Sequence, residues 1–258
     1  MCLIALAWKV HPRYRLALIA NRDEFHARPA APAQAHSDAP QVFGGRDIEK
    51  GGSWLLASRA GRVAAVTNVR VGLSPSPVPR SRGSLVDGFA KSSQSPEEFL
   101  AGLSAHAAEY GRFNLVIGDG DSLLFASNHP EFRWQPIPPG LQALSNGDLN
   151  APWPKVERAR QALGQWLEAT PAPSSADPGV TALFDALADS RVAADDTLPD
   201  TGVGLERERM LSAPFVVGPV YGTRASTVLL MGTDSLWLAE RSFAANGVFA
   251  GEQVLSVP

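Results

Sequence analysis

The strongest constraint on the fold is a repeated pairing of short apolar segments along the chain. Each pair is joined by a few turn-forming residues, which is the pattern of a β-hairpin. The pairs are 2–8 with 14–21, 53–58 with 62–68, 113–117 with 122–127, and 226–231 with 236–240. Because hairpins join neighbouring antiparallel strands, the sequence predicts sheets that are largely antiparallel.

Helices are expected between these hairpins. Ser95 is a suitable N-cap, with Pro96 in the first turn and Glu98 completing a capping box. Apolar residues at helical spacing predict two more helices over 154–168 and 180–188. Buried hairpins interrupted by helices favour an α+β layered fold, with two antiparallel sheets between helical layers as the candidate architecture.

Length and composition exclude several classes of protein. A chain of 258 residues can bury a large core, and we expect one domain over 1–258. With a net charge of -3 it lacks the basic field of a nucleic-acid-binding protein, so no nucleic-acid partner is expected. No apolar run approaches the ~18 residues of a membrane-spanning helix. A single cysteine cannot form an internal disulfide, which is typical of a reducing compartment, and a cytoplasmic location is expected.

That single cysteine is Cys2, and it opens the first apolar segment. Once Met1 is removed, as is usual before a small side chain, Cys2 carries both a thiol and an α-amine. The amine, with a pKa of ~7.7 to 8.0, can accept the thiol proton. Such a pair is an activated nucleophile for acyl transfer. A small cysteine in an apolar strand is also ordinary packing, and position alone favours that reading.

The densest polar cluster follows the second apolar segment and consists of Asn21, Arg22, Asp23 and Glu24. These side chains are costly to bury unless they are paired, and strand ends often present functional groups. The alternative interpretation is a solvated turn. Because the first of these residues continue an apolar segment, we favour a functional cluster.

Three further residues are candidates for binding a negatively charged group. Asn68 and Asn146 each end an apolar run, where an amide can donate to an oxyanion or simply form a turn. Arg224 lies between a loop and an apolar segment, a position that suits an anion clamp or a structural ion pair.

Other common sites are missing from the sequence. The histidines show no zinc-binding spacing, so no metal site is expected. Neither a dinucleotide-binding glycine motif nor a phosphate-binding loop is present. We therefore expect no required cofactor.

Taken in order, the motifs resemble the NRDE family, the transport and Golgi organisation protein 2 homologues. The blocks that carry the resemblance span nearly the whole chain: 1–2, 21–24 with 28–29, 44–47 with 51–55, 67–70, 113–115, 144–146 with 152–155, 198–202, and 221–224. The resemblance implies a link to lipid and haem handling without an agreed reaction.

More distantly, the chain is similar to N-terminal-nucleophile hydrolases of the choloylglycine hydrolase and penicillin V acylase type, whose fold is a four-layer αββα sandwich. This similarity implies that Cys2 attacks the carbonyl of a non-peptide C–N amide or acyl bond. It also implies that Asn146, with Asn68, stabilises the oxyanion, while Arg22, Asp23 or Glu24 orients the amine.

One departure from that pattern concerns the second strand. The similar enzymes carry an Arg with an Asp three residues later. Here either Asn21 with Glu24 fills that spacing, or Arg22 is the Arg and Phe25 stands in the Asp position. A shift of one residue turns a strand side chain to the opposite face. We expect the first register, in which Asn21 faces Cys2.

Our leading hypothesis is an amidohydrolase-like protein that acts on a small-molecule amide or acyl substrate. The rival is a non-catalytic protein that binds haem or an acyl lipid, with Cys2 or His26 contacting the ligand. A third hypothesis is a structural protein, in which the motif residues would scatter over the surface.

Overall fold

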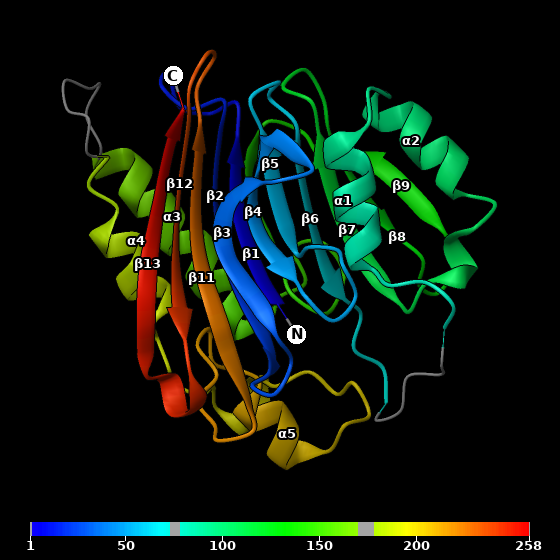
Figure 1. The fold of residues 1–258 in the computed structure, drawn as a ribbon. Helices are drawn as coiled ribbons and strands as arrows, with labels where there is room; N and C mark the ends of the chain where they lie inside the picture. Colours follow the sequence, from blue (N-terminus) through cyan, green and yellow to red (C-terminus); the bar gives the residue numbers. More distant parts are fainter. Residues whose placement is uncertain (1, 73–77, 170–177, 258) are drawn as a thin grey trace.

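Four layers make up the fold of the computed structural model, which describes residues 2–72, 78–169 and 178–257 (Figure 1). Two β-sheets lie face to face, and helices cover the outer face of each. Helices α3 (Pro154–Ala169) and α4 (Thr181–Leu187) cover the first sheet, and α1 (Gly83–Lys91) and α2 (Pro96–Leu103) cover the second. The expected αββα sandwich is confirmed. The expected removal of Met1 concerns a residue that lies outside the part of the chain that the structure describes.

Every pair of neighbouring strands in both sheets is antiparallel. The first sheet has the order β10 (Gly140–Leu144), β1 (Cys2–Trp8), β2 (Leu16–Phe25), β11 (Tyr221–Met231), β12 (Leu236–Phe243) and β13 (Phe249–Val257). The second has the order β3 (Ala30–His36), β4 (Ala39–Asp47), β5 (Leu55–Ser58), β6 (Val63–Asn68), β7 (Phe113–Gly118), β8 (Leu123–Ser127) and β9 (Arg133–Pro136). A further helix, α5 (Leu205–Met210), lies near one end of the sandwich (Figure 1).

The predicted hairpins are confirmed as β1 with β2, β5 with β6, β7 with β8, and β11 with β12. The capping box before α2 is also confirmed, because Ser95 Oγ accepts from the Glu98 N–H while the Glu98 carboxylate accepts from the Ser95 N–H. Helix α1 and strands such as β13 were not expected. Strand β13 is a mostly exposed sheet edge, so it lacks the apolar alternation that marks a strand in a sequence.

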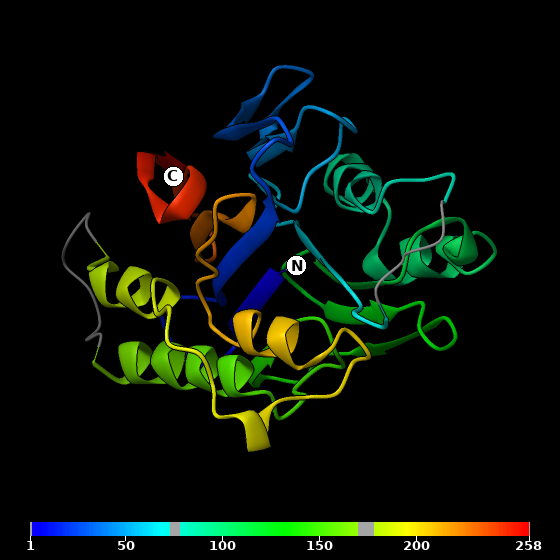
Figure 2. The same ribbon diagram turned by 90° about the horizontal axis from the view of Figure 1, so that it is seen from below.

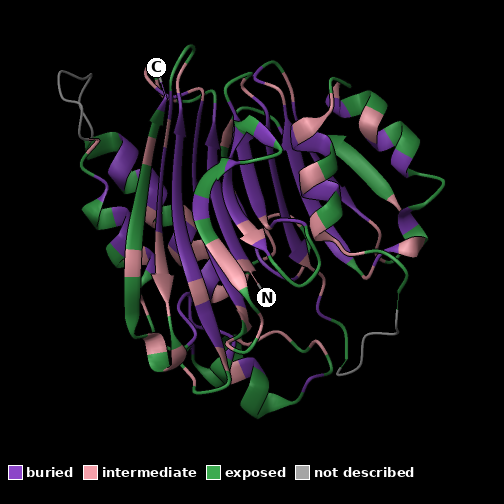
Figure 3. Cartoon of the chain, viewed as in Figure 1, coloured by how far each residue is buried: buried purple, intermediate pink, exposed green. Residues whose placement is uncertain are grey.

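Three apolar layers hold the sandwich together, and Figure 3 shows the buried residues running along both sheets. Leu6 and Leu18 from the first sheet meet Val116 and Phe125 from the second in the layer between the sheets. A second layer joins the first sheet to α3 and α4, and a third joins the second sheet to α1 and α2. Every strand near the centre is therefore covered on both faces, which explains the nearly continuous apolar runs in the sequence.

The pairing of β1 with β2 decides which polar side chains face Cys2. Cys2 lies opposite Arg22 and Leu3 lies opposite Asn21. Directly opposite residues share a face of the sheet, and successive residues alternate. Arg22 therefore shares the face of Cys2, toward the second sheet. The expected register, with Asn21 facing Cys2, is wrong, because the connection between the strands sets the register and its geometry could not be read from the sequence.

Asn21 instead ties the first sheet to its helical layer. Its Nδ2 donates to the carbonyls of Leu187 (2.8 Å) and Pro214 (2.9 Å), and its Oδ1 accepts from Ser226 Oγ (2.6 Å). The residue is almost fully buried. Its place in the motif is thus explained by these buried bonds.

Replacing Asn21 with alanine is expected to lower the free energy of unfolding by about 3 kcal/mol, since the change leaves two buried carbonyls and one hydroxyl without a partner. Urea unfolding measures this loss. Ser226→Ala removes only one of the bonds and should cost less. The structural role of Asn21 is contradicted if Asn21→Ala leaves the free energy of unfolding unchanged and instead slows the reaction of the Cys2 thiol with an alkylating reagent.

Glu240 is a buried carboxyl group that links the two sheets. It accepts from the Ala33 N–H (2.8 Å) and from Thr227 Oγ1 (3.1 Å). Burial raises the pKa of Glu240 to about 7, and these hydrogen bonds limit the rise. The folded protein therefore holds a proton on Glu240 at pH values where the unfolded chain releases it.

The stability of the fold should fall as pH rises from the ordinary Glu pKa of 4.5 to about 7, because only the folded state resists ionisation. Glu240→Gln removes this loss. We expect the variant to be more stable than the wild type by up to about 3 kcal/mol near pH 8 and to match it near pH 4. Urea unfolding at both pH values measures the difference, and a difference independent of pH would refute the explanation.

Candidate active site

A cavity of about 80 Å³ opens at the N-terminal end of β1, beside the half-buried Cys2. Figure 2 looks onto this end of the sandwich, with the N-terminus near the middle and α1 and α5 on different sides of it. Of the residues proposed from the sequence, Cys2, Arg22, Asp23, Glu24 and Asn68 line the cavity. These motif residues converge on one place, which argues against the hypothesis of a purely structural protein.

Arg22 is held in the cavity wall by an aromatic ring. Its guanidinium carbon lies 4.3 Å from the centroid of the Trp54 ring, a cation–π distance, and the residue is buried. A Cβ on Gly45 would come within 2.1 Å of the Trp54 ring, so only glycine allows the ring to lie there. This contact explains why Gly45 and Trp54 occur in the same stretch of sequence.

Asp23 is oriented by β11, the other neighbour of β2. Thr223 Oγ1 donates to Asp23 Oδ1 (2.6 Å) and itself accepts from the Val216 N–H (2.9 Å). Tyr221 donates its hydroxyl to the Asp23 carbonyl (3.2 Å). The sequence reasoning selected Arg224 from this stretch and missed Thr223. The sequence does contain a hint of this role, since the hydroxyl of a threonine near the end of a strand can hydrogen-bond to a neighbouring carboxylate and hold it in position.

Arg224 is not placed as an anion clamp at Cys2. Its guanidinium donates to the carbonyls of Phe25 (3.0 Å), His26 (3.0 Å) and Arg28 (3.1 Å). These bonds hold the segment after β2 in a turn, so Arg224 stabilises the chain next to the site and does not line the cavity itself. A β-bulge between Thr223 and Ala225 turns the Arg224 side chain out of the regular alternation.

The two asparagines proposed as oxyanion donors have different positions. Asn146 is fully buried, and its Nδ2 donates to the Asn68 carbonyl (2.9 Å) and to Asn68 Oδ1 (3.0 Å). Asn68 lines the cavity. Because Asn68 Oδ1 is an acceptor in this pair, the NH₂ group of Asn68 is the part that can donate to a ligand. Asn146 thus holds Asn68 in place, and of the two asparagines only Asn68 lines the cavity.

Ser145 connects this asparagine pair to the nucleophile strand. Its Oγ donates to the Cys2 carbonyl (2.7 Å), and the Ser145 carbonyl accepts from Thr67 Oγ1 (2.6 Å). The end of β6 and the segment after β10 are therefore fixed against β1.

The charges around Cys2 act against one another. Burial raises the pKa of the Cys2 thiol, Asp23 raises it further, and Arg22 and Arg82 lower it. The thiol therefore needs a base to react at neutral pH. Arg82 also lines the cavity. It was not predicted from the sequence because it lies in a polar stretch without a motif of its own. Burial lowers the pKa of Arg82, and the charges of Cys2 and Glu24 counteract this fall.

A larger cleft of about 660 Å³ adjoins the Cys2 cavity, and Glu24, Asn68 and Arg82 line both. The cleft combines arginines and one carboxylate, Glu24, with apolar surface, and the charge of Arg70 is met by the buried Glu208 (2.7 Å). Its arginines are Arg70, Arg82, Arg112 and Arg207, and its apolar side chains include Phe25, Val71, Val78, Val203, Met210 and Leu211. A ligand with an anionic group and an apolar body would match this lining.

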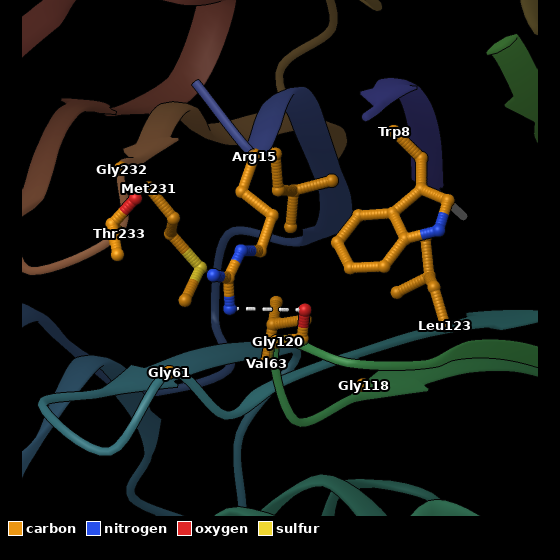
Figure 4. A pocket seen from close by; sticks show the side chains of 11 residues that line it. Trp8, Arg15, Gly61, Val63, Gly118, Gly120, Leu123, Met231, Gly232 and Thr233 are labelled. Carbon is orange, nitrogen blue, oxygen red and sulfur yellow. Dashed lines mark hydrogen bonds between the residues drawn. The ribbon is translucent and has the colours of Figure 1, made fainter. Parts of the chain in front are cut away.

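A much smaller cavity lies at the opposite end of β1, between Trp8, Arg15 and Met231 (Figure 4). Arg15 crosses it to donate to the Gly120 carbonyl (3.1 Å). Its volume of about 20 Å³ is close to that of one water molecule. It is too small to hold an organic substrate.

Within the described residues, no three His, Cys, Asp or Glu side chains gather as a metal-binding group. Among the helices that the structure describes, none has both the length and the apolarity needed to cross a bilayer.

Comparison with known proteins places these features in a family. The model of the family described as Transport and Golgi organisation 2 matches residues 1–245. The Transport and Golgi organization protein 2 homologs of Bos taurus and Homo sapiens are 34% and 32% identical to the chain, each match covering 94% of the chain and 93% of the relative. Among solved structures, penicillin V acylase from Agrobacterium tumefaciens is similar in fold, with a TM-score of 0.50, 10% identity, and coverage of 99% of this chain and 86% of the acylase.

Proposed function

This chain belongs to the Transport and Golgi organisation 2 family, and from the geometry of its site we propose that it is an N-terminal-nucleophile amidohydrolase. It cleaves a non-peptide amide or acyl bond through Cys2. The observation that carries the proposal is the arrangement around Cys2, where a thiol at the start of β1 lies in one cavity with Arg22, Asp23 and the amide of Asn68. The penicillin V acylase likeness concerns the fold alone.

The reaction requires that Cys2 be the first residue. Its α-amine then accepts the thiol proton, and the thiolate sulfur attacks the carbonyl carbon of the substrate. The C–N bond breaks as the leaving amine takes the proton from the α-ammonium, which leaves a thioester on Cys2. Water attacks the thioester while the α-amine accepts its proton, and that proton returns to the sulfur as the acid departs.

The neighbouring side chains have separate roles in this scheme. Asn68 donates its NH₂ group to the oxyanion of the tetrahedral intermediate, and Asn146 keeps that group oriented. Asp23, fixed by Thr223, orients the α-amine. Arg22 favours the thiolate over the thiol.

The adjoining cleft supplies the substrate specificity. Its arginines and apolar side chains favour an amide that joins an apolar acyl chain to an anionic group. Such a molecule would leave its carbonyl at the boundary of cleft and cavity, beside Asn68.

The same cleft also favours a second candidate, a binding protein that holds an anionic amphiphile without turnover. Haem fits the residues less well than an acyl ligand does. His26, which was expected as an alternative to Cys2 for contacting the ligand, lies outside both cavity linings, and its Nε2 is 3.1 Å from the Gly218 carbonyl. Of the two residues that were expected to contact haem, only Cys2 therefore lines the cavity.

Amine release from synthetic amides separates the two candidates. We expect the protein to hydrolyse an N-acyl amino acid faster than the neutral N-acylethanolamine of equal chain length, since only the former carries an anion for the cleft. Amine is quantified with a fluorogenic reagent, with Cys2→Ala as the blank. Binding of the N-acyl amino acid without any release would favour the binding protein.

A further inference from the structure

Two arginines that line the Cys2 cavity, Arg22 and Arg82, form no ion pair with any described residue. Arg22 has an exposed fraction of 6%, and its Nη1 has no hydrogen-bond partner among the residues that the structure describes. Arg82 is half-buried, and its Nη1 donates to the carbonyl of Arg112 (3.3 Å). A buried guanidinium group without an acceptor is costly. This pair of cations is therefore suited to binding an anionic ligand.

The carboxylates of the same cavity are engaged by other groups. Arg28, which also lines the cavity, forms ion pairs with both Asp47 (2.6 Å) and Glu24 (3.7 Å). Asp23 accepts from a hydroxyl of β11 and is assigned above to the α-amine. The two arginines described in the previous paragraph are therefore the cations of this cavity that a ligand can use.

The start of helix α1 adds a smaller contribution at the same place. Ser81, Arg82 and Gly83 line the cavity, and Gly83 is the first residue of the helix. The Gly83 N–H is bonded to Ser81 Oγ (3.3 Å), so the helix acts here through the partial positive charge of its N-terminal end. No acidic residue lies in the first turn of this helix to offset that charge. The helix therefore adds to the field of the two arginines.

The cavity and the cleft differ in size, which decides the half of an amide that each one takes. The cavity has a volume of about 80 Å³ and the cleft one of about 660 Å³, so an apolar acyl chain fits only the cleft. Asn68 and Arg82 line both. A carbonyl held at Asn68 with its acyl chain in the cleft therefore places the amine half in the cavity, beside Arg82. In the amide of an α-amino acid a single carbon separates the nitrogen from the carboxylate, so that carboxylate lies in the cavity as well.

We propose that the Cys2 cavity is the subsite for an anionic leaving group, where Arg82 and Arg22 bind the carboxylate of a small amino acid that carries the acyl chain on its nitrogen. The proposal rests on the function proposed above and assigns the recognition of the anion to one part of the site. Arg82 is then the residue that determines specificity for an anionic amine. Arg112 and Arg207 of the cleft are exposed, and water screens their charges more strongly than it screens those in the cavity.

Two alkylating reagents that differ in charge test the subsite without any turnover. N-iodoacetylglycine carries the amide and carboxylate of the proposed substrate class, and N-iodoacetylglycinamide is its neutral counterpart. Because Cys2 is the only cysteine, intact mass reports the reaction of each reagent with this thiol alone. Both reagents attack the same thiolate, so the ratio of their rates cancels any change in the thiol pKa. We expect the ratio of charged to neutral reagent at Cys2 to exceed that of free N-acetylcysteine by about tenfold.

Variants of one segment show whether Arg82 is responsible for this preference. Arg82→Met should lose most of the excess, and Arg82→Lys should keep part of it because the positive charge remains. Arg80→Met is the matched control, since Arg80 is exposed in the same segment and lines neither the cavity nor the cleft, and it should leave the ratio unchanged. With amide substrates, Arg82→Met should lower kcat/KM for an N-acyl amino acid about tenfold and change that for the neutral N-acylethanolamine much less.

Three results would overturn the subsite: a wild-type ratio no higher than that of the free thiol, an Arg82→Met ratio equal to that of the wild type, or a fall in Arg207→Met as large as that in Arg82→Met. The last would place the anion among the exposed arginines of the cleft. The first requires no variant, so it decides the matter even if Arg82→Met does not fold. Failure of the proposed function is a different outcome, in which the ratios are as expected and no amide is hydrolysed.

Discussion

Replacing Cys2 with alanine is expected to lower amide turnover by more than about a thousandfold, since the change removes the only nucleophile of the proposed reaction. The fold should tolerate the change. Cys2 is half-buried at the start of a strand, and its backbone bonds to β2 and to Ser145 do not involve the thiol. We expect the free energy of unfolding to change by less than about 1 kcal/mol.

Binding and chemistry should separate in this variant. The apolar and arginine side chains of the cleft remain, so Cys2→Ala should still bind an N-acyl amino acid, as isothermal titration would measure. Cys2→Ser is the matched control, because it retains the α-amine and a weaker nucleophile and should keep slow residual turnover. Turnover by Cys2→Ala equal to that of the wild type would rule out the mechanism.

Asn68→Ala is expected to lower kcat by about a hundredfold to a thousandfold, the usual effect of losing one oxyanion donor, and to change KM much less. Asn128→Ala is a suitable control, because Asn128 also bonds backbone atoms at a strand end but does so away from the cavity. Steady-state kinetics on the same amide measure both effects.

Asn146→Ala should have a smaller effect on kcat than Asn68→Ala, since it removes the residue that orients the donor and leaves the donor itself. The reverse order, with Asn146 the more important for kcat, would show that Asn146 contacts the substrate and would contradict the placement of Asn68 in the cavity wall.

Local patterns in the sequence predicted local structure well. The hairpins and the capping box at Ser95 depend on residues close in sequence, and both are confirmed. The αββα architecture was inferred through the family resemblance, because periodicity alone does not assign strands to two sheets. Strands β3 and β13 escaped notice, since edge strands carry weak alternation. Strand β4 also escaped notice, because Pro40 and the paired glycines Gly44 and Gly45 interrupt its apolar pattern.

Properties that depend on register or on distant contacts could not be predicted. Arg22 and Asn21 differ by one position, and only the pairing with β1 shows which of them faces Cys2. The contact between Asn68 and Asn146, which leaves only Asn68 in the cavity wall, depends on a bond across 78 residues of chain.

The central claim is that Cys2 becomes a reactive first residue, and the intact mass of the purified protein tests it most directly. The mass is measured before and after exposure to a thiol-reactive acylating probe. Peptide mapping of the N-terminus then shows which atom carries the acyl group. We predict that the protein lacks methionine ahead of Cys2 and gains a single acyl group on the Cys2 sulfur. A protein that retains Met1, or that gains no acyl group at Cys2, would contradict the claim.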